Sequence, residues 1–252
     1  MEILIAVFEG FIGSALLAYS IYFYNKRNKQ KFKKFFSKKS SDKYYVAVTA
    51  FEPTTLDLYY RPKTGYGELI SLANISKSIA YCDNYDKLIS FVYLSSENSF
   101  SAHLFDENLI VIGGSTHNRV MRFFKTKISD LLRVKIYDEY SGRIKSSADF
   151  CLIDYEGKKY KSIVDNHIVT KDYGLVTKIP NPINKQRTLI LIDGLHTFGL
   201  VAASKFLLHE YIKQYYIQLN KLNDNYFQII IEADVKDYEV FIKNIKYFKI
   251  NV

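Results

Sequence analysis

The stretch RTLILIDGLHTFGLVAASKFL, Arg187–Leu207, joins an apolar run to an Ala-rich helical pattern. The apolar run is typical of a buried strand and ends at Asp193-Gly194, and the helical pattern begins near Gly199. A loop between a strand and a helix directs backbone N–H groups at the helix N-terminus, where an anion is favoured. The sequence therefore predicts an anion-binding loop over residues 194–199.

Strands and helices alternate on both sides of this loop. Strands are expected at 45–51, 88–94, 109–112, 188–192 and 227–232, and helices at 67–81, 120–128, about 198–219 and, briefly, from Val235. Residues 133–179 instead show short alternating runs typical of a β-meander. Nearly continuous apolar runs such as LIVIGG and LILIDG are typical of parallel strands covered on both faces. We therefore expect an α/β fold, a Rossmann-like three-layer domain with a mostly parallel sheet, which carries the meander as a β-hairpin insertion.

The N-terminal region has the features of a membrane anchor. Residues 3–24 form an apolar run with one charge, Glu9, which is long enough to cross a bilayer as a helix. A dense Lys/Arg cluster follows at once, and the positive-inside rule then places the N-terminus outside and the rest in the cytoplasm. We expect a single-pass protein of the cell membrane, with a transmembrane helix at 1–24, a basic juxtamembrane linker at 25–43 and a cytoplasmic domain at 44–252.

Two features of this region leave alternatives open. Ala6, Gly10, Ser14 and Ala18 recur on one helix face, which favours a homo-oligomer through the transmembrane helix, although small residues also recur by chance. The basic residues of 25–43, interleaved with phenylalanines, suit an anionic leaflet. The alternative is a solvated linker that only sets the topology.

The net charge of +9 is unevenly distributed along the chain. Residues 1–43 hold nine basic and three acidic residues, a net charge of +6, which leaves +3 for residues 44–252. A nucleic-acid-binding domain usually carries its basic footprint on the folded part, so we expect no nucleic-acid partner. Cys82 and Cys151 lack metal-ligand spacing, and there is no clustered Cys/His motif, so neither a metal nor another cofactor is expected.

Three glycine-bearing loops are expected near the carboxyl ends of strands, where open α/β sheets bind ligands. None of them matches G-x-G-x-x-G or the P-loop pattern, but together they would line one crevice. The residues expected to bind the ligand are Gly65, Gly67, Gly113, Gly114, Ser115, Thr116, His117, Asn118, Asp172, Tyr173, Gly194, His196, Thr197 and Gly199. The alternative is structural: the two histidines would satisfy a helix cap or a backbone carbonyl, and Asp172-Tyr173 would be a turn residue and a half-buried aromatic.

The order Gly-Gly-x-x-x-Asn (113–118), Asp-Tyr-Gly (172–174), Asn-Pro (181–182) and Gly-x-His-x-x-Gly (194–199) resembles a group of uncharacterised prokaryotic Rossmann-like domains. The likeness covers roughly residues 44–235. A membrane helix joined to a cytoplasmic nucleotide-pocket domain is similar to membrane-linked sensors and effectors of bacterial nucleotide signalling and phage defence.

Three functions are compatible with these patterns. The first is a membrane-tethered sensor or effector that binds a nucleotide or other phosphorylated ligand. The second is an enzyme that hydrolyses NAD or another N-glycosidic bond, which needs a positioned carboxylate. The third is a structural scaffold without catalysis. The candidate catalytic residues are Glu68, Asp172, Asp193 and His196.

Overall fold

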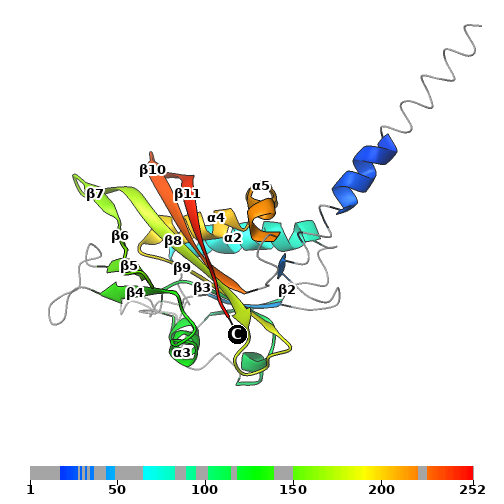
Figure 1. Cartoon of the computed structure of the whole chain (residues 1–252), viewed down its shortest axis with the longest axis horizontal. Helices are drawn as coiled ribbons and strands as arrows, with labels where there is room; N and C mark the ends of the chain where they lie inside the picture. The colour runs from blue at the N-terminus through cyan, green and yellow to red at the C-terminus, as the bar shows by residue number, and fades with distance from the viewer. Residues whose placement is uncertain are drawn as a thin grey trace, which may run out of the picture.

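The structure is a computed structural model, and it describes residues 18–27, 29, 32, 35–36, 44–48, 65–82, 89–94, 102–114, 118–138, 150–220 and 226–251. Within these ranges the chain forms a large sheet and a small sheet with helices packed on them (Figure 1). The strands are β1 (Tyr44–Val48), β2 (Ile89–Leu94), β3 (Leu109–Ile112), β4 (Val134–Asp138), β5 (Phe150–Asp154), β6 (Lys159–Lys161), β7 (Ile163–Asp165), β8 (Ile168–Pro180), β9 (Thr188–Gly194), β10 (Phe227–Lys236) and β11 (Glu239–Lys249). The helices are α2 (Tyr66–Cys82), α3 (Arg119–Lys127), α4 (Thr197–Phe206) and α5 (His209–Asn220), with a 3-10 helix, η2, at Ala102–Asp106.

The large sheet is mixed, with the strand order β11-β10-β8-β9-β3-β1-β2 and β7 paired to β8. β9, β3, β1 and β2 pair in parallel. β11, β10, β8 and β9 pair antiparallel, as do β7 and β8. Both pairings of the small sheet, β4-β5-β6, are antiparallel as well. The predicted Rossmann-like domain with a mostly parallel sheet is therefore wrong, because antiparallel pairings predominate in this α/β fold.

The error arises first at β8, which the sequence placed in the meander insertion. β8 lies between β10 and β9 in the large sheet, and its last nine residues are all buried. Helix α4 contacts it, and residues of β8 also enter the apolar cluster of the small sheet. A continuous apolar run shows that a strand is covered on both faces. It does not show whether the neighbouring strands run parallel or antiparallel to that strand.

The second error concerns the C-terminal hairpin. The short helix expected from Val235 is wrong, because β10 turns at Asp237-Tyr238 into the long strand β11. These two turn residues have φ of 51° and 64°, as a two-residue type I′ hairpin loop requires. Such loops usually contain Asn-Gly or Asp-Gly. Tyr238 stands in the second position, where glycine is usual, so the sequence does not indicate this turn.

The helices cover the large sheet unequally (Figure 1). α2, α4 and α5 lie on one face, where they share an apolar cluster with inward side chains such as Ile110, Ile190 and Ile229. α3 lies on the other face, and its Met121 and Phe124 pack on the sheet there. The small sheet lies on the same side as α3.

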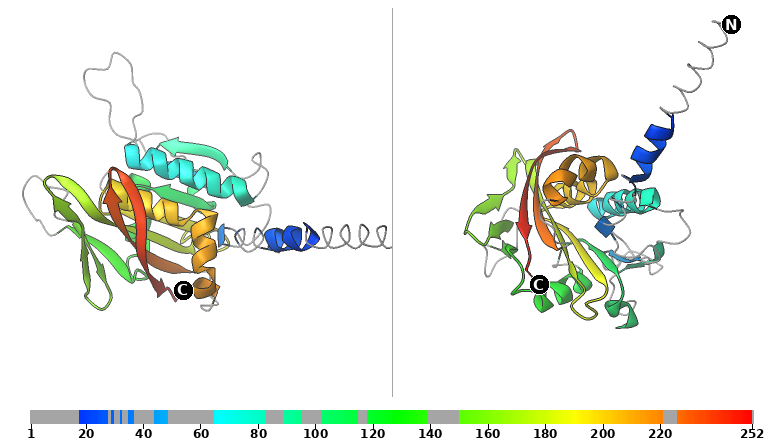
Figure 2. Two further views of the ribbon diagram at one scale, coloured as in Figure 1. Left: turned by 90° about the horizontal axis from the view of Figure 1, so that it is seen from above. Right: turned by 45° about the vertical axis from the view of Figure 1, so that its right-hand side comes forward.

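The described residues do not support the predicted single-pass anchor. Residues 18–27 form a helix that stands away from the two sheets (Figure 2), and residues 1–17 lie outside the described part. No helix among the described residues is long and apolar enough to cross a membrane, which corrects the predicted membrane location. Phe32, Phe35 and Phe36, from the segment predicted as a juxtamembrane linker, are buried in the core of the helical face.

Candidate functional site

The described parts of the three glycine loops meet near the carboxyl end of β9. A Cβ atom on Gly67 would lie 3.0 Å from the Thr197 side chain, so the start of α2 contacts the start of α4. A Cβ atom on Gly114 would lie 3.6 Å from the Asp193 carboxylate, so the loop after β3 lies beside the end of β9. Gly113 has φ of 111°, a value that favours glycine. The remaining residues of that predicted loop, Ser115, Thr116 and His117, lie outside the described residues.

Three glycines around α4 are explained by close packing of the helix on the sheet. A Cβ atom on Gly199 would lie 2.2 Å from the Tyr173 carbonyl oxygen. One on Gly174 would lie 2.3 Å from the Gly199 carbonyl oxygen, and one on Gly194 would lie 2.2 Å from the backbone nitrogen of Leu200. Because real Cβ atoms do not approach backbone this closely, only glycine lets α4 cross β8 at this distance.

The N-terminus of α4 already has a hydrogen-bond acceptor, the carboxyl group of Asp172 on β8. Its oxygens accept hydrogen bonds from the N–H of Gly199 at 2.5 Å, the N–H of Tyr173 at 2.8 Å and the hydroxyl of Ser162 at 2.6 Å. Burial raises the pKa of Asp172, and these hydrogen bonds and nearby His196 only partly oppose the rise. The protein itself therefore occupies the helix end that the sequence marked for a ligand.

His196 is the N-cap residue of α4 by position, but its side chain makes no capping hydrogen bond. Its backbone is extended, and its ring lies close enough to Asp172 to affect that carboxyl electrostatically. Among the described side chains, its Nε2 is a buried nitrogen without a hydrogen-bond partner. Thr197, which follows, is exposed at the start of α4. The strand residue Asp172, rather than the N-cap residue, thus satisfies this helix end.

Three further predicted residues are distributed over different elements. Tyr173 is 8% exposed and packs against Tyr160 of the small sheet, with 5.7 Å between ring centroids. Glu68 lies in the first turn of α2, where the carbonyl of Gly65 accepts a hydrogen bond from Leu69. Tyr173 thus belongs to the interface between the two sheets, while Gly65 and Glu68 lie at the start of a helix on the other face.

Asn118 caps the start of α3. Its side-chain oxygen accepts from the N–H of Met121 at 3.0 Å, and its amide group donates to the Ile112 carbonyl at 2.9 Å. The side chain is fully buried, and asparagine is among the preferred N-cap residues. Asn118 therefore joins the end of β3 to α3.

Asp193, at the end of β9, forms an ion pair with Lys125 of α3. Its other carboxylate oxygen accepts from the N–H of Gly194 at 2.8 Å. The Asp193 side chain is 2% exposed and that of Lys125 is 18% exposed. This buried pair fixes α3 against the large sheet and places the Lys125 ammonium at the edge of a cavity.

The cavity has a volume of about 380 Å³ and lies between α3, β4 and the large sheet. α3 contributes Arg122 and Lys125 to its lining, and β4 contributes Lys135. The large sheet contributes apolar side chains, including Leu175 and Leu191. Small-molecule sites are typically concave and mostly apolar, with a few polar groups that orient the ligand. The cavity combines these features with three cationic side chains.

Gln228 of β10 holds β4 in place beside this cavity. Its side-chain oxygen accepts from the N–H groups of Arg133 and Val134 at 2.6 and 2.8 Å. Its amide group donates to the Val134 carbonyl at 3.0 Å and to the Thr177 hydroxyl at 3.1 Å. The side chain thus pairs with the start of β4 as a neighbouring strand would, and it joins the small sheet to the large one.

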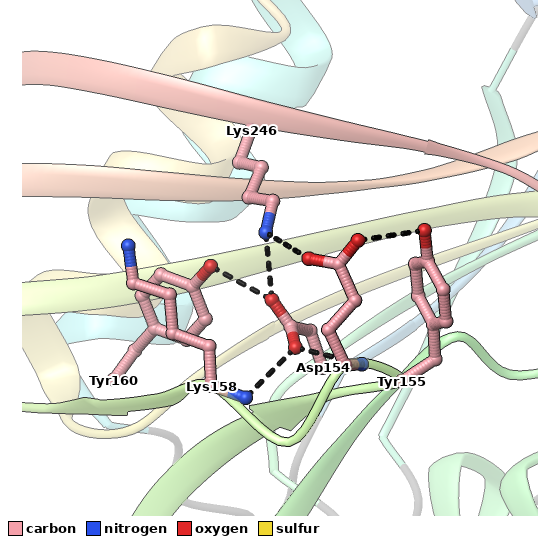
Figure 3. A network of polar contacts seen from close by, with 6 residues as sticks. Asp154, Tyr155, Lys158, Tyr160 and Lys246 are labelled. Atoms are coloured by element: carbon pink, nitrogen blue, oxygen red, sulfur yellow. Dashed lines mark hydrogen bonds and ion pairs between the residues drawn. The ribbon is translucent and has the colours of Figure 1, made fainter.

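A second polar network joins the end of β5 and the turn after it to β11 (Figure 3). The Asp154 carboxylate accepts from the Tyr160 hydroxyl at 2.9 Å, the Lys158 N–H at 3.0 Å and the Lys246 ammonium of β11 at 2.8 Å. Burial raises the pKa of Asp154, but these donors outweigh burial and the pKa is lowered overall. The hydrogen bond to Asp154 raises the pKa of Lys246. The Gln228 contacts thus join β4 to the large sheet, and the Asp154 contacts join β5 and β6 to it.

Positive charge is concentrated beside the cavity. Residues 119–135 hold six basic residues and one acidic residue, a net charge of +5, although residues 44–252 together carry only +3. The basic residues are Arg119, Arg122, Lys125, Lys127, Arg133 and Lys135. This run is a charge signal in the sequence itself, although it is smaller than the +6 of residues 1–43.

The described residues do not support the expected nucleotide binding or signalling. Gly194 and Gly199, which were expected to surround a phosphate group, bring backbones together instead, and the helix end expected to face a ligand faces Asp172. No family model matches the chain, and no curated protein is significantly similar to it in sequence.

Proposed function

We propose that this protein binds a small phosphorylated molecule with an apolar part in the cavity between α3 and β4. The observation that carries the proposal is the placement of Arg122, Lys125 and Lys135 around one cavity with an apolar floor. Arginine and lysine are the residues that most often bind phosphate groups. An apolar part of the ligand would gain free energy by covering Leu175 and Leu191.

The electrostatic surroundings support an anionic ligand. Asp193 pairs with Lys125, and none of the residues that line the cavity is acidic. The segment 119–135 carries +5 in a region that is otherwise nearly balanced. Such a local excess attracts anions and raises their concentration at the cavity.

Two of the three candidate carboxylates, Asp172 and Asp193, favour binding over hydrolysis. Asp172 is fully buried and accepts hydrogen bonds from its own fold, and Asp193 is paired with Lys125. Hydrolysis of an N-glycosidic bond needs a carboxylate within hydrogen-bond reach of the reacting groups. We therefore favour a binding protein over the enzyme that the sequence left as an alternative.

Calorimetric titration of the full chain with phenyl phosphate tests this proposal. Phenol, which lacks the charge, and inorganic phosphate, which lacks the ring, should both bind more weakly than phenyl phosphate. Lys135→Gln should weaken phenyl phosphate binding by about tenfold, the usual effect of losing one charged hydrogen bond. Lys236→Gln is the matched control, because Lys236 is exposed at the opposite end of β10 from Gln228, roughly 25 Å along the strand. Equal affinity for phenol, or equal weakening by both substitutions, would reject the cavity as the site.

A further inference from the structure

A shallow groove lies on α3 directly beside the cavity. Its lining residues are Arg119, Arg122, Phe123, Thr126 and Lys127, and none of them is acidic. Arg122 and Thr126 line both the groove and the cavity. The two depressions are therefore neighbours that share one wall.

Helix geometry aligns the groove residues. Arg119, Arg122 and Thr126 are spaced by three and four residues and so lie on one face of α3. From Arg119 to Thr126 the helix rises roughly 10 Å, which is the length of a short chain of phosphoryl groups. This row thus begins at Arg122 and Thr126, which also line the cavity, and ends at Arg119, which lines the groove alone.

Phe123 gives the groove a fixed aromatic surface. Its side chain is 37% exposed, and its ring packs edge-on against Phe105 at 4.8 Å and Phe124 at 5.2 Å between centroids. The Lys127 ammonium lies 5.9 Å from the centroid of the Phe123 ring. A cation–π contact of this kind favours the ammonium beside the groove.

We infer that the ligand is an oligophosphate, a small molecule that carries two or more linked phosphoryl groups. One phosphoryl group lies in the cavity near Lys135, and the next ones pass Thr126 and contact Arg119 and Lys127 in the groove. This inference rests on the proposed function, because the cavity remains the site of the first phosphoryl group. The concave cavity next to a groove only about 10 Å long favours a small molecule over a nucleic acid, which follows longer basic stripes.

The test compares inorganic phosphate, pyrophosphate and tripolyphosphate in calorimetric titrations of the full chain. Affinity should increase with each added phosphoryl group. The double substitution Arg119→Gln/Lys127→Gln should weaken tripolyphosphate binding by about tenfold, because two exposed ion pairs each contribute modestly. The same variant should weaken phenyl phosphate binding much less than tripolyphosphate binding, because that ligand reaches only the cavity and loses only long-range attraction. Lys236→Gln again serves as the control for charge alone.

The outcomes separate this inference from the proposed function. Phenyl phosphate binding that is weakened by Lys135→Gln would support the cavity as the site. If tripolyphosphate binding is then unchanged by Arg119→Gln/Lys127→Gln, the oligophosphate inference is rejected and the cavity proposal stands. Loss of phenyl phosphate binding in the double variant would also overturn the assignment of the groove to later phosphoryl groups. A 12-nucleotide DNA strand that binds through Arg119 and Lys127 and resists displacement by tripolyphosphate would overturn it in favour of a nucleic acid.

Discussion

The Asp172 carboxylate on β8 accepts a hydrogen bond of 2.5 Å from the backbone N–H of Gly199 in the first turn of α4. A strand residue thus caps a helix that begins after the next strand, and the N-cap residue His196 makes no capping bond with its side chain. The absence of a side chain at Gly199 is what allows α4 to approach β8 closely enough for this contact. The cap and the close crossing therefore depend on each other.

Asp172→Asn should destabilise the fold in a pH-dependent manner. Asparagine cannot accept all three hydrogen bonds, so at least one buried N–H loses its partner, at a cost of about 1–3 kcal/mol. Because burial raises the pKa of Asp172 in the folded state, that state binds more protons than the unfolded chain above about pH 4. The difference in free energy of unfolding between the wild type and the variant should be largest at low pH. It should decrease as pH rises through the raised pKa of Asp172. Urea denaturation of both proteins between pH 4 and pH 8 measures this difference, and a constant difference would contradict it.

Gly199→Ala should lower the free energy of unfolding by about 3 kcal/mol or prevent folding, because the new Cβ atom would overlap the Tyr173 carbonyl. Gly114→Ala is the matched control, since its Cβ atom would meet only the Asp193 carboxylate at an ordinary 3.6 Å. Its effect should stay within about 1 kcal/mol, as for most substitutions without a clash. Urea midpoints report both values. Similar midpoint shifts would show that α4 does not cross β8 as described.

Gln228→Met should loosen the small sheet while keeping the volume of the side chain. Methionine leaves the N–H groups of Arg133 and Val134 without their acceptor, and an unpaired buried group such as the N–H of Val134 costs about 1–3 kcal/mol. Amide hydrogen exchange in β4 should become faster, and phenyl phosphate binding should weaken with the loss of the cavity wall. Gln186→Met, in the exposed loop before β9, should change neither. Unchanged exchange in β4 would mean that Gln228 does not hold it.

Asp154→Asn should show the opposite pH dependence to Asp172→Asn. Burial raises the pKa of Asp154, but the donors Lys246, Lys158 and Tyr160 lower it overall, so the carboxylate stabilises the folded state above its unfolded pKa of about 4. The wild type should therefore have the higher free energy of unfolding at neutral pH, and this difference should disappear as pH falls below about 4. Denaturation between pH 2 and pH 7 tests this, with Asp165→Asn as an exposed control. A wild-type advantage that grows on acidification would rule out the network.

The local elements of this fold are largely readable from the sequence. The strand expected at 109–112 and the helix expected at 67–81 correspond to β3 and α2. Both depend on hydrophobic periodicity over a few residues, which burial of one face imposes on any strand or helix. The single helix expected at 198–219 is instead two helices, α4 and α5, that meet at Leu207 and Leu208.

The candidate site was only partly readable. The sequence places glycines and His196 on three loops, with Asp172 before a separate strand, and the structure brings the described loop residues together near β9. Whether a glycine admits a phosphate or a neighbouring backbone depends on what lies opposite it, and Tyr173 opposite Gly199 is far away in the chain. The basic run 119–135 could be predicted from charge alone. The cavity beside it could not, because β4 and the large sheet form its other walls.

The sequence alone determined the short-range features of this protein: most strand and helix positions, the glycines at strand ends and the charge concentrated over 119–135. The tertiary structure decided the order and direction of the strands, the capping of α4 by Asp172 and the cavity beside Lys125. The physical reason is that a strand alternates its side chains in the same way whether its neighbour runs parallel or antiparallel. Direction, caps and cavities arise only from contacts between residues far apart in the chain, which local patterns do not encode.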